Sequence, residues 1–286
     1  MSKMFDALKR AESERRRKQE ESTPPATAFE PVESPVRESA PAAPTHFTAA
    51  PFVRREAPSA VMPVSSPAAD PGDGAGLSPD LVRELGILRN SIEAKLDKRT
   101  GRVLMFTSAM HGEGATTLAL GYARLLAMHH DHRVLLVELN ARTPSLAARL
   151  GLSNPEGVTH YFAMRRALSS LVSRPAGEAF DVIHVGTPDP TQIQINLERA
   201  FPHMIEEAMR SYDTVIVDAP PVVVCPETPP LSPFVDGAVL VIHSGRTKRE
   251  TVERSVKQIQ QFQGRVLGVV LNRKRYYIPY FIYKRL

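Results

Sequence analysis

The sequence predicts an α/β fold, doubly wound around a mainly parallel β-sheet. Short runs of apolar, β-branched residues alternate with longer stretches at helical spacing through residues 77–272, a pattern typical of βαβ units. The short runs are almost continuously apolar, as strands covered by helices on both faces should be. We expect strands at residues 102–108, 133–139, 180–185, 214–218, 237–242 and 266–271, and helices at residues 79–96, 117–129, 194–211 and 248–262.

The region before this domain has a different composition. Residues 22–76 hold 11 of the chain's 25 prolines, with few large apolar side chains between them. Such a segment buries too little surface to offset the entropy of ordering, so we expect a disordered linker. Residues 1–21 begin with apolar positions at helical spacing, which predicts a short amphipathic helix. A helix this short is unstable alone, so it either docks on a partner or is a frayed terminus.

Charge and cysteine content limit the classes of protein to which the chain can belong. The 286-residue chain has a formal net charge of +5 and one cysteine, which excludes an internal disulfide. The tail, residues 273–286, contains five basic residues and no acidic one. The basic character therefore belongs to the tail, and we expect no nucleic-acid partner. No apolar stretch approaches the ~20 residues of a membrane span, so we expect a cytoplasmic protein.

A glycine-rich loop follows the first predicted strand of the domain. Residues 107–117 read TSAMHGEGATT, close to the phosphate-binding P-loop pattern G-x-x-x-x-G-K-[ST] between a strand and a helix. Ala115 stands at the lysine position, and the Thr116 hydroxyl is a candidate magnesium ligand. Backbone N–H groups of such a loop bind phosphate oxygens. The expected nucleotide-binding residues are Gly112, Glu113, Gly114, Ala115, Thr116 and Thr117.

Three other predicted strands end in polar residues. One ends at Asp218, one runs into Glu138 and Arg142, and the last ends at Asn272. Ligands of open α/β sheets bind beyond the carboxyl ends of the strands, so we expect these residues near the loop. A carboxylate at Asp218 can hold magnesium directly or through water, and the amide of Asn272 can contact an adenine edge.

These motifs together resemble the bacterial tyrosine kinases of polysaccharide export, relatives of the Min and Par positioning ATPases. The resemblance covers roughly residues 77 to 286 and rests on the loop, on the strand ending ELNARTP at residues 138–144, and on DAPP at residues 218–221. It implies a P-loop NTPase fold that binds ATP or ADP with Mg²⁺. It also implies catalytic roles for Asp218, Glu138 and Arg142, and magnesium contacts for Thr116, Asp218 and Glu138.

The chain departs from the family pattern at three places. The family's lysine is Ala115, and its D-x-D-x-R motif has Glu138 and Asn140 in place of the two aspartates. The favoured interpretation is a catalytically weakened, nucleotide-binding regulator of exopolysaccharide or capsule synthesis and export. Two alternatives stay open: an active ATP-dependent autokinase in which Arg142 replaces the lysine, and a Min/Par-like positioning ATPase.

The resemblance also implies partners and a location. We expect a membrane polysaccharide copolymerase (chain-length regulator) as partner, at the inner face of the cell membrane. Of the family's E-x-x-R-x-x-R oligomerisation pattern, only Arg89 is present, which weakens but does not remove the expectation of a homo-oligomer.

The tail holds four of the chain's seven tyrosines. In the resembled family a C-terminal tyrosine cluster is autophosphorylated, which makes these four candidate phospho-acceptors. Phosphorylation would cancel much of the tail's positive charge. Equally, a basic and aromatic tail suits the headgroup region of a membrane, and both interpretations stay open. The residues concerned are Tyr276, Tyr277, Tyr280 and Tyr283.

Overall fold

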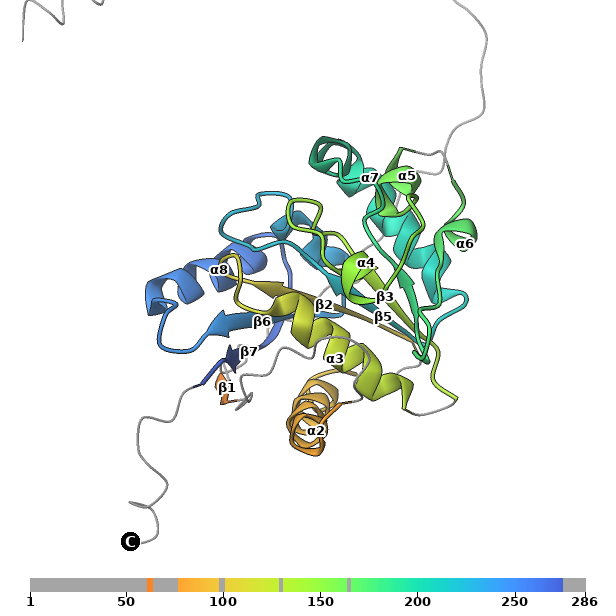
Figure 1. Cartoon of the computed structure of the whole chain (residues 1–286). Coiled ribbons are helices and arrows are strands. Elements are labelled where there is room, and N and C mark those ends of the chain that lie inside the picture. Colours follow the sequence, from red (N-terminus) through yellow and green to blue (C-terminus); the bar gives the residue numbers. More distant parts are fainter. Residues whose placement is uncertain (1–60, 64–76, 98–100, 129–130, 164–165, 275–286) are drawn as a thin grey trace, which may run out of the picture. The chain divides into compact units, whose positions relative to one another are not determined.

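The computed structural model describes residues 61–63, 77–97, 101–128, 131–163 and 166–274 (Figure 1). All of these belong to one compact unit, Glu56–Leu286. The predicted N-terminal helix, most of the predicted linker and the tyrosine cluster lie outside the described residues. None of the helices in the described ranges is both long and apolar enough to cross a membrane.

The unit is built on a seven-stranded sheet in which every pairing is parallel. The strand order is β1-β7-β6-β2-β5-β3-β4. The six predicted strands are confirmed to within two residues at each end. The strands are β1 (Val61–Pro63), β2 (Arg102–Ser108), β3 (Val134–Glu138), β4 (Asp181–Ile183), β5 (Thr214–Asp218), β6 (Gly237–His243) and β7 (Val266–Asn272).

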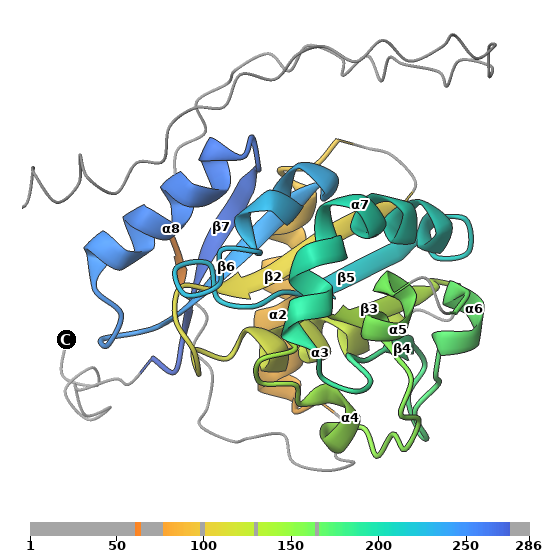
Figure 2. The same cartoon turned by 90° about the horizontal axis from the view of Figure 1, so that it is seen from above.

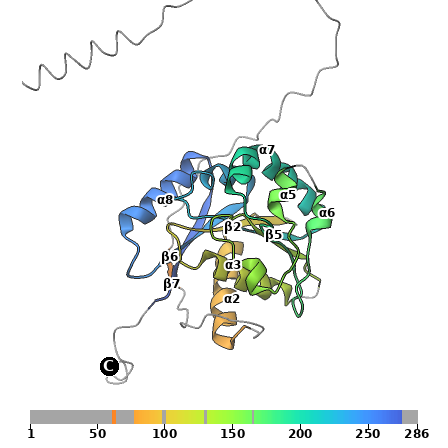
Figure 3. The same ribbon diagram turned by 45° about the horizontal axis from the view of Figure 1, so that its top comes forward.

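Helices cover both faces of this sheet, which confirms the doubly wound fold (Figure 3). On one face lies α3 (Ala115–Ala127), with α2 (Pro79–Glu93) packed on its outer side. On the other lie α7 (Pro190–Met209) and α8 (Arg249–Gln261), shown in front of the sheet in Figure 2. The buried residues accordingly form two clusters, one for each face. Alternate residues of each strand point to opposite faces, so the continuous apolar runs supply both clusters.

Several short elements were not predicted. Strand β1 lies within the expected linker and pairs with β7 at the edge of the sheet. The connections contain α4 (Leu146–Arg149), α5 (Val158–Phe162), α6 (Leu168–Leu171) and the 3₁₀ helix η1 (Pro229–Phe234). Helices of four to six residues span too few turns to show helical periodicity in a sequence.

Candidate functional site

The glycine-rich loop joins the central strand β2 to the start of α3. Gly112 and Gly114 both have positive φ, 76° and 97°, a backbone region that glycine adopts without steric cost. Gly114 is the N-cap of α3, and no side chain caps the helix there. The first-turn N–H groups of α3 therefore have no side-chain acceptor and, with the helix dipole, favour an anion.

The buried side chain of Glu113 stabilises the glycine-rich loop by hydrogen bonds. Glu113 is only 4% exposed, and its Oε2 accepts a hydrogen bond from the Met110 N–H at 2.8 Å. Its other carboxylate oxygen accepts from the Thr247 hydroxyl. Asn272 donates from Nδ2 to the Glu113 carbonyl at 2.8 Å. Asn272 thus reaches the loop as predicted, but its amide supports the backbone there, and its contact with an adenine edge stays a prediction.

Asp218 ends β5, directly beside β2, and its carboxylate has no hydrogen-bond partner. The residue is fully buried, and neither carboxylate oxygen accepts a hydrogen bond. Burial, and then the nearby Glu138 carboxylate, raise its pKa to about 8, while the close Thr116 hydroxyl and Arg149 act in the opposite direction. A buried carboxylate without a partner costs considerable free energy. Its position next to Thr116 marks a place where a cation would be stabilising.

Glu138, the neighbour of Asp218 across the β3–β5 pairing, is bonded differently. Its Oε1 accepts from the N–H groups of Ser145 at 2.6 Å and Leu146 at 2.9 Å, and its Oε2 from the N–H of Val185 at 3.3 Å. Burial raises its pKa, and these three bonds oppose the shift. Both oxygens are thus occupied by the backbone, contrary to the expectation that Glu138 would face magnesium.

Asn140 and Arg142, which follow Glu138, also have local partners. The Asn140 amide donates to the Thr143 hydroxyl at 2.9 Å and accepts from the Thr143 N–H, so it closes a turn. Arg142 donates from Nε to Glu227 at 3.1 Å, and this ion pair raises its pKa. Arg142 therefore links the loop after β3 to the loop after β5, and in this structure its charge is directed at Glu227 instead of the glycine-rich loop.

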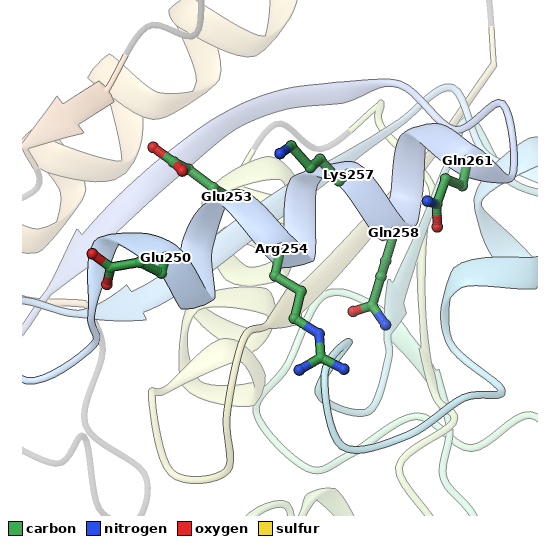
Figure 4. A pocket seen from close by; sticks show the side chains of 6 residues that line it. All are labelled: Glu250, Glu253, Arg254, Lys257, Gln258 and Gln261. Carbon is green, nitrogen blue, oxygen red and sulfur yellow. The ribbon is translucent and has the colours of Figure 1, made fainter.

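A hollow lies on the surface of α8 (Figure 4). Its lining comes from this one helix, which makes it a polar helix surface and not a ligand-binding cleft. The lining residues are Glu250, Glu253, Arg254, Lys257, Gln258 and Gln261.

Known structures and sequences resemble the chain in fold and sequence. The kinase domain of the Escherichia coli tyrosine kinase ETK superposes with a TM-score of 0.64 at 25% identity, over 70% of this chain and 79% of that chain. The VpsO kinase domain gives 0.61 at 26% identity, over 68% and 95%. Among curated proteins, the tyrosine-protein kinase YwqD of Bacillus subtilis is 28% identical over 188 residues, which is 66% of this chain and 79% of YwqD. No protein-family model matches the chain.

By sequence and fold, the chain is similar to the bacterial tyrosine kinases. A second relative in this kinase family, the tyrosine-protein kinase CpsD of Streptococcus agalactiae, is 26% identical over 176 residues, or 61% of this chain and 76% of CpsD. Compared with the pattern that the resemblance implies, the site has the glycine turn, Thr116 and Asp218, and it has Ala115 at the position of the lysine.

Arg89 and the tail tyrosines are two further residue sets for which the resemblance implies a role. Arg89 pairs with Glu93 one turn along α2, at 2.7 Å, so part of its bonding capacity is used within its own helix. The four candidate phospho-acceptor tyrosines of the tail lie outside the described residues, and their role stays a prediction.

Sequence reasoning missed one residue of the site. Arg149, at the end of α4, donates from Nη1 to the Thr117 hydroxyl at 3.0 Å. No motif indicates this contact, because the two residues belong to different βα units. A basic residue shortly after the ELNARTP segment was the only available signal.

Proposed function

We propose that this bacterial tyrosine kinase-like chain binds ATP or ADP with Mg²⁺ at the glycine-rich loop and has weakened phosphoryl transfer. The observation that carries the proposal is the buried carboxylate of Asp218, without a partner and next to Thr116. An uncapped helix N-terminus suits the phosphates, and an unpaired carboxylate beside a hydroxyl suits a hard divalent cation. The residues of the site themselves therefore fit the phosphates of a nucleotide and a bound Mg²⁺.

The magnesium contacts that fit are Thr116 and Asp218. Glu138 is less available, because its carboxylate already accepts hydrogen bonds from three backbone N–H groups. When bound, Mg²⁺ would neutralise charge on the phosphate oxygens. The protein's own contribution is to hold the phosphates on the backbone of the loop and to keep Asp218 ready for the metal.

Weakened transfer follows from Ala115. The side chain at this position, the first residue of α3, carries no charge to stabilise the transferred phosphoryl group. Loss of one preorganised charge-stabilising donor typically costs ~3–4 kcal/mol in the transition state, or ~10²–10³ in rate. Binding suffers less, because the backbone amides and Thr116 remain.

In the cell, this site would serve regulation of polysaccharide export. Support comes from the relatives YwqD and CpsD, both tyrosine-protein kinases, and from a Klebsiella pneumoniae relative described as a putative tyrosine-protein kinase in the cps region, 23% identical over 185 residues. The proposed partner is a membrane polysaccharide copolymerase. The proposed location is the inner face of the membrane, with the tail as phospho-acceptor or membrane contact.

Calorimetry with ATP and ADP, with and without Mg²⁺, tests the nucleotide part of the proposal. We expect both nucleotides to bind, with higher affinity for ATP when Mg²⁺ is present. Phosphotyrosine detection after incubation with Mg²⁺ and ATP tests the catalytic part, for which we expect little labelling. Strong labelling of the tail that disappears in Asp218→Asn would contradict weakened phosphoryl transfer and favour the active autokinase.

A further inference from the structure

A positive charge reaches the phosphate-binding end of α3 from outside the loop. Thr117 lies in the first turn of α3, two residues after Ala115. The Arg149 guanidinium donates to its hydroxyl at 3.0 Å, and so lies at the helix end where phosphate oxygens are favoured. The cation that the loop lacks in sequence is thus present nearby in space.

The helix that presents Arg149 is held firmly in place. With only four residues, α4 would not form alone. Glu138 accepts hydrogen bonds from the N–H groups of Ser145 and Leu146 at its start, and Leu146 is fully buried. Glu138 therefore supports α4, and with it Arg149 at the end of that helix.

The charge of Arg149 is not neutralised by an ion pair with any described acidic residue, in contrast to two other arginines of the domain. Arg142 pairs with Glu227 and Arg124 with Glu178. Among the described residues, the Arg149 side chain donates only to Thr117, so most of its five donors are available to a ligand. It is close enough to Asp218 and Glu138 to oppose the rise that burial causes in the pKa of both.

Resting on the nucleotide-binding function proposed above, we propose that Arg149, although it does not take over the lysine's part in phosphoryl transfer, binds a phosphate group of a nucleoside di- or triphosphate at the start of α3. The orphaned Asp218 carboxylate independently indicates a ligand at this place. A phosphate brought near two buried carboxylates needs a compensating cation, and guanidinium groups bind phosphate by two parallel hydrogen bonds.

The test is calorimetry with ADP on the full chain. Arg149→Ala and Arg149→Gln should weaken ADP binding ~10- to 100-fold, the range for a hydrogen bond to a charged group. Arg149→Lys should retain most of the affinity, since it keeps the charge. Arg174→Ala is the matched control and should bind as wild type, because this arginine pairs with Asp181 at the first residue of β4, the end of the strand away from the site.

Two further readouts separate a charge effect from a structural one. Arg149→Gln keeps a donor for Thr117, so it should fold even if Arg149→Ala does not, and it should reduce the salt dependence of ADP affinity. Lysine restored by Ala115→Lys should increase ADP affinity more in Arg149→Gln than in wild type, because both cations serve one phosphate.

The outcomes distinguish the inference from the function on which it rests. If Arg149→Gln binds ADP as tightly as wild type, the proposed role of Arg149 is wrong. It is also wrong if the variant loses ADP affinity but the salt dependence of that affinity is unchanged. Neither result contradicts nucleotide binding itself. If wild-type protein and Ala115→Lys both fail to bind ATP and ADP, the nucleotide-binding function fails, and this inference fails with it.

Discussion

Asp218 and Glu138 end two neighbouring strands at the same register and are both buried, yet they are bonded in opposite ways. Glu138 accepts three backbone hydrogen bonds, whereas Asp218 accepts none. The fold thus uses one carboxylate as a structural support and leaves the other for a ligand. Position at a strand end does not by itself decide between these roles; the residues that follow each strand do.

The chain after each strand explains the difference. After Glu138 it turns back, so that the N–H groups of Ser145 and Leu146 point at the carboxylate. After Asp218 come Ala219, Pro220 and Pro221, and proline has no N–H to donate. Side-chain length contributes as well, since glutamate reaches one bond further than the aspartate of the family pattern.

The largest effect on stability should come from Glu138→Ala. Removal of the carboxylate leaves three backbone N–H groups without an acceptor, each of which carries a desolvation cost. We expect a loss of about 3 kcal/mol in the free energy of unfolding, measured by urea denaturation without nucleotide.

Asp218→Asn is the matched variant for that experiment. It removes a buried ionisable group whose oxygens accept no hydrogen bond, so the apoprotein should be as stable as wild type or more stable. If both variants lose the same stability, the contrast between the two carboxylates is wrong.

A second prediction concerns magnesium. Asp218→Asn should remove the Mg²⁺-dependent part of ATP affinity, which we expect to be ~10-fold, or about 1.4 kcal/mol. Thr116→Ala should lose a smaller part. ATP titrations with and without Mg²⁺ measure both, and a Mg²⁺ effect that survives in Asp218→Asn would place the metal elsewhere.

The third prediction is a pH dependence of stability. The pKa of Asp218 rises from 3.8 to about 8 on folding, so between these values the folded state keeps a proton that the unfolded state has released. The free energy of unfolding should therefore decrease as pH rises through this window, with a slope of up to about 1.4 kcal/mol per pH unit. The raised pKa of Glu138 acts in the same direction.

Denaturation curves across that window, on wild type and Asp218→Asn, measure this slope. The variant should show a distinctly shallower decrease, because only Glu138 then contributes. Parallel curves for the two proteins would mean that Asp218 does not carry the proton.

The smallest effect should come from Arg142→Ala. Its side chain is 41% exposed and pairs with a Glu227 that is 6% exposed, so solvent screens much of the interaction. We expect a loss of about 1 kcal/mol in thermal or urea unfolding, mainly from the unpaired Glu227. A loss as large as that of Glu138→Ala would show that the link between the two loops supports the fold as much as α4 does.

The sequence predicted the parts of the fold that have a strong local signal. Six strands and four helices follow from continuous apolar runs and helical spacing, and they occur within a few residues of the expected bounds. Strand β1 and α4 carry no such signal, since a few residues take up regular structure there through contacts with β7 and Glu138.

The site, like the fold, could be predicted only where it has a local sequence signal. The loop, Thr116 and Asp218 follow from spacing and strand ends. The bonds from Thr247 to Glu113 and from Arg149 to Thr117 join residues 134 and 32 positions apart, and no local pattern encodes them. The backbone bonds of Glu138 could not be predicted, because the family motif indicates a carboxylate and not its partners.

The central claim is that the loop still binds a triphosphate although its phosphoryl transfer is weakened. The most direct test measures ATP affinity and ATP turnover on the same preparation of wild-type protein, with Ala115→Lys in parallel. The account predicts saturable, Mg²⁺-dependent ATP binding in both proteins, and a wild-type turnover rate ~10²–10³ below that of the lysine variant. Equal turnover in the two proteins, or a wild-type chain that binds no ATP, would contradict it.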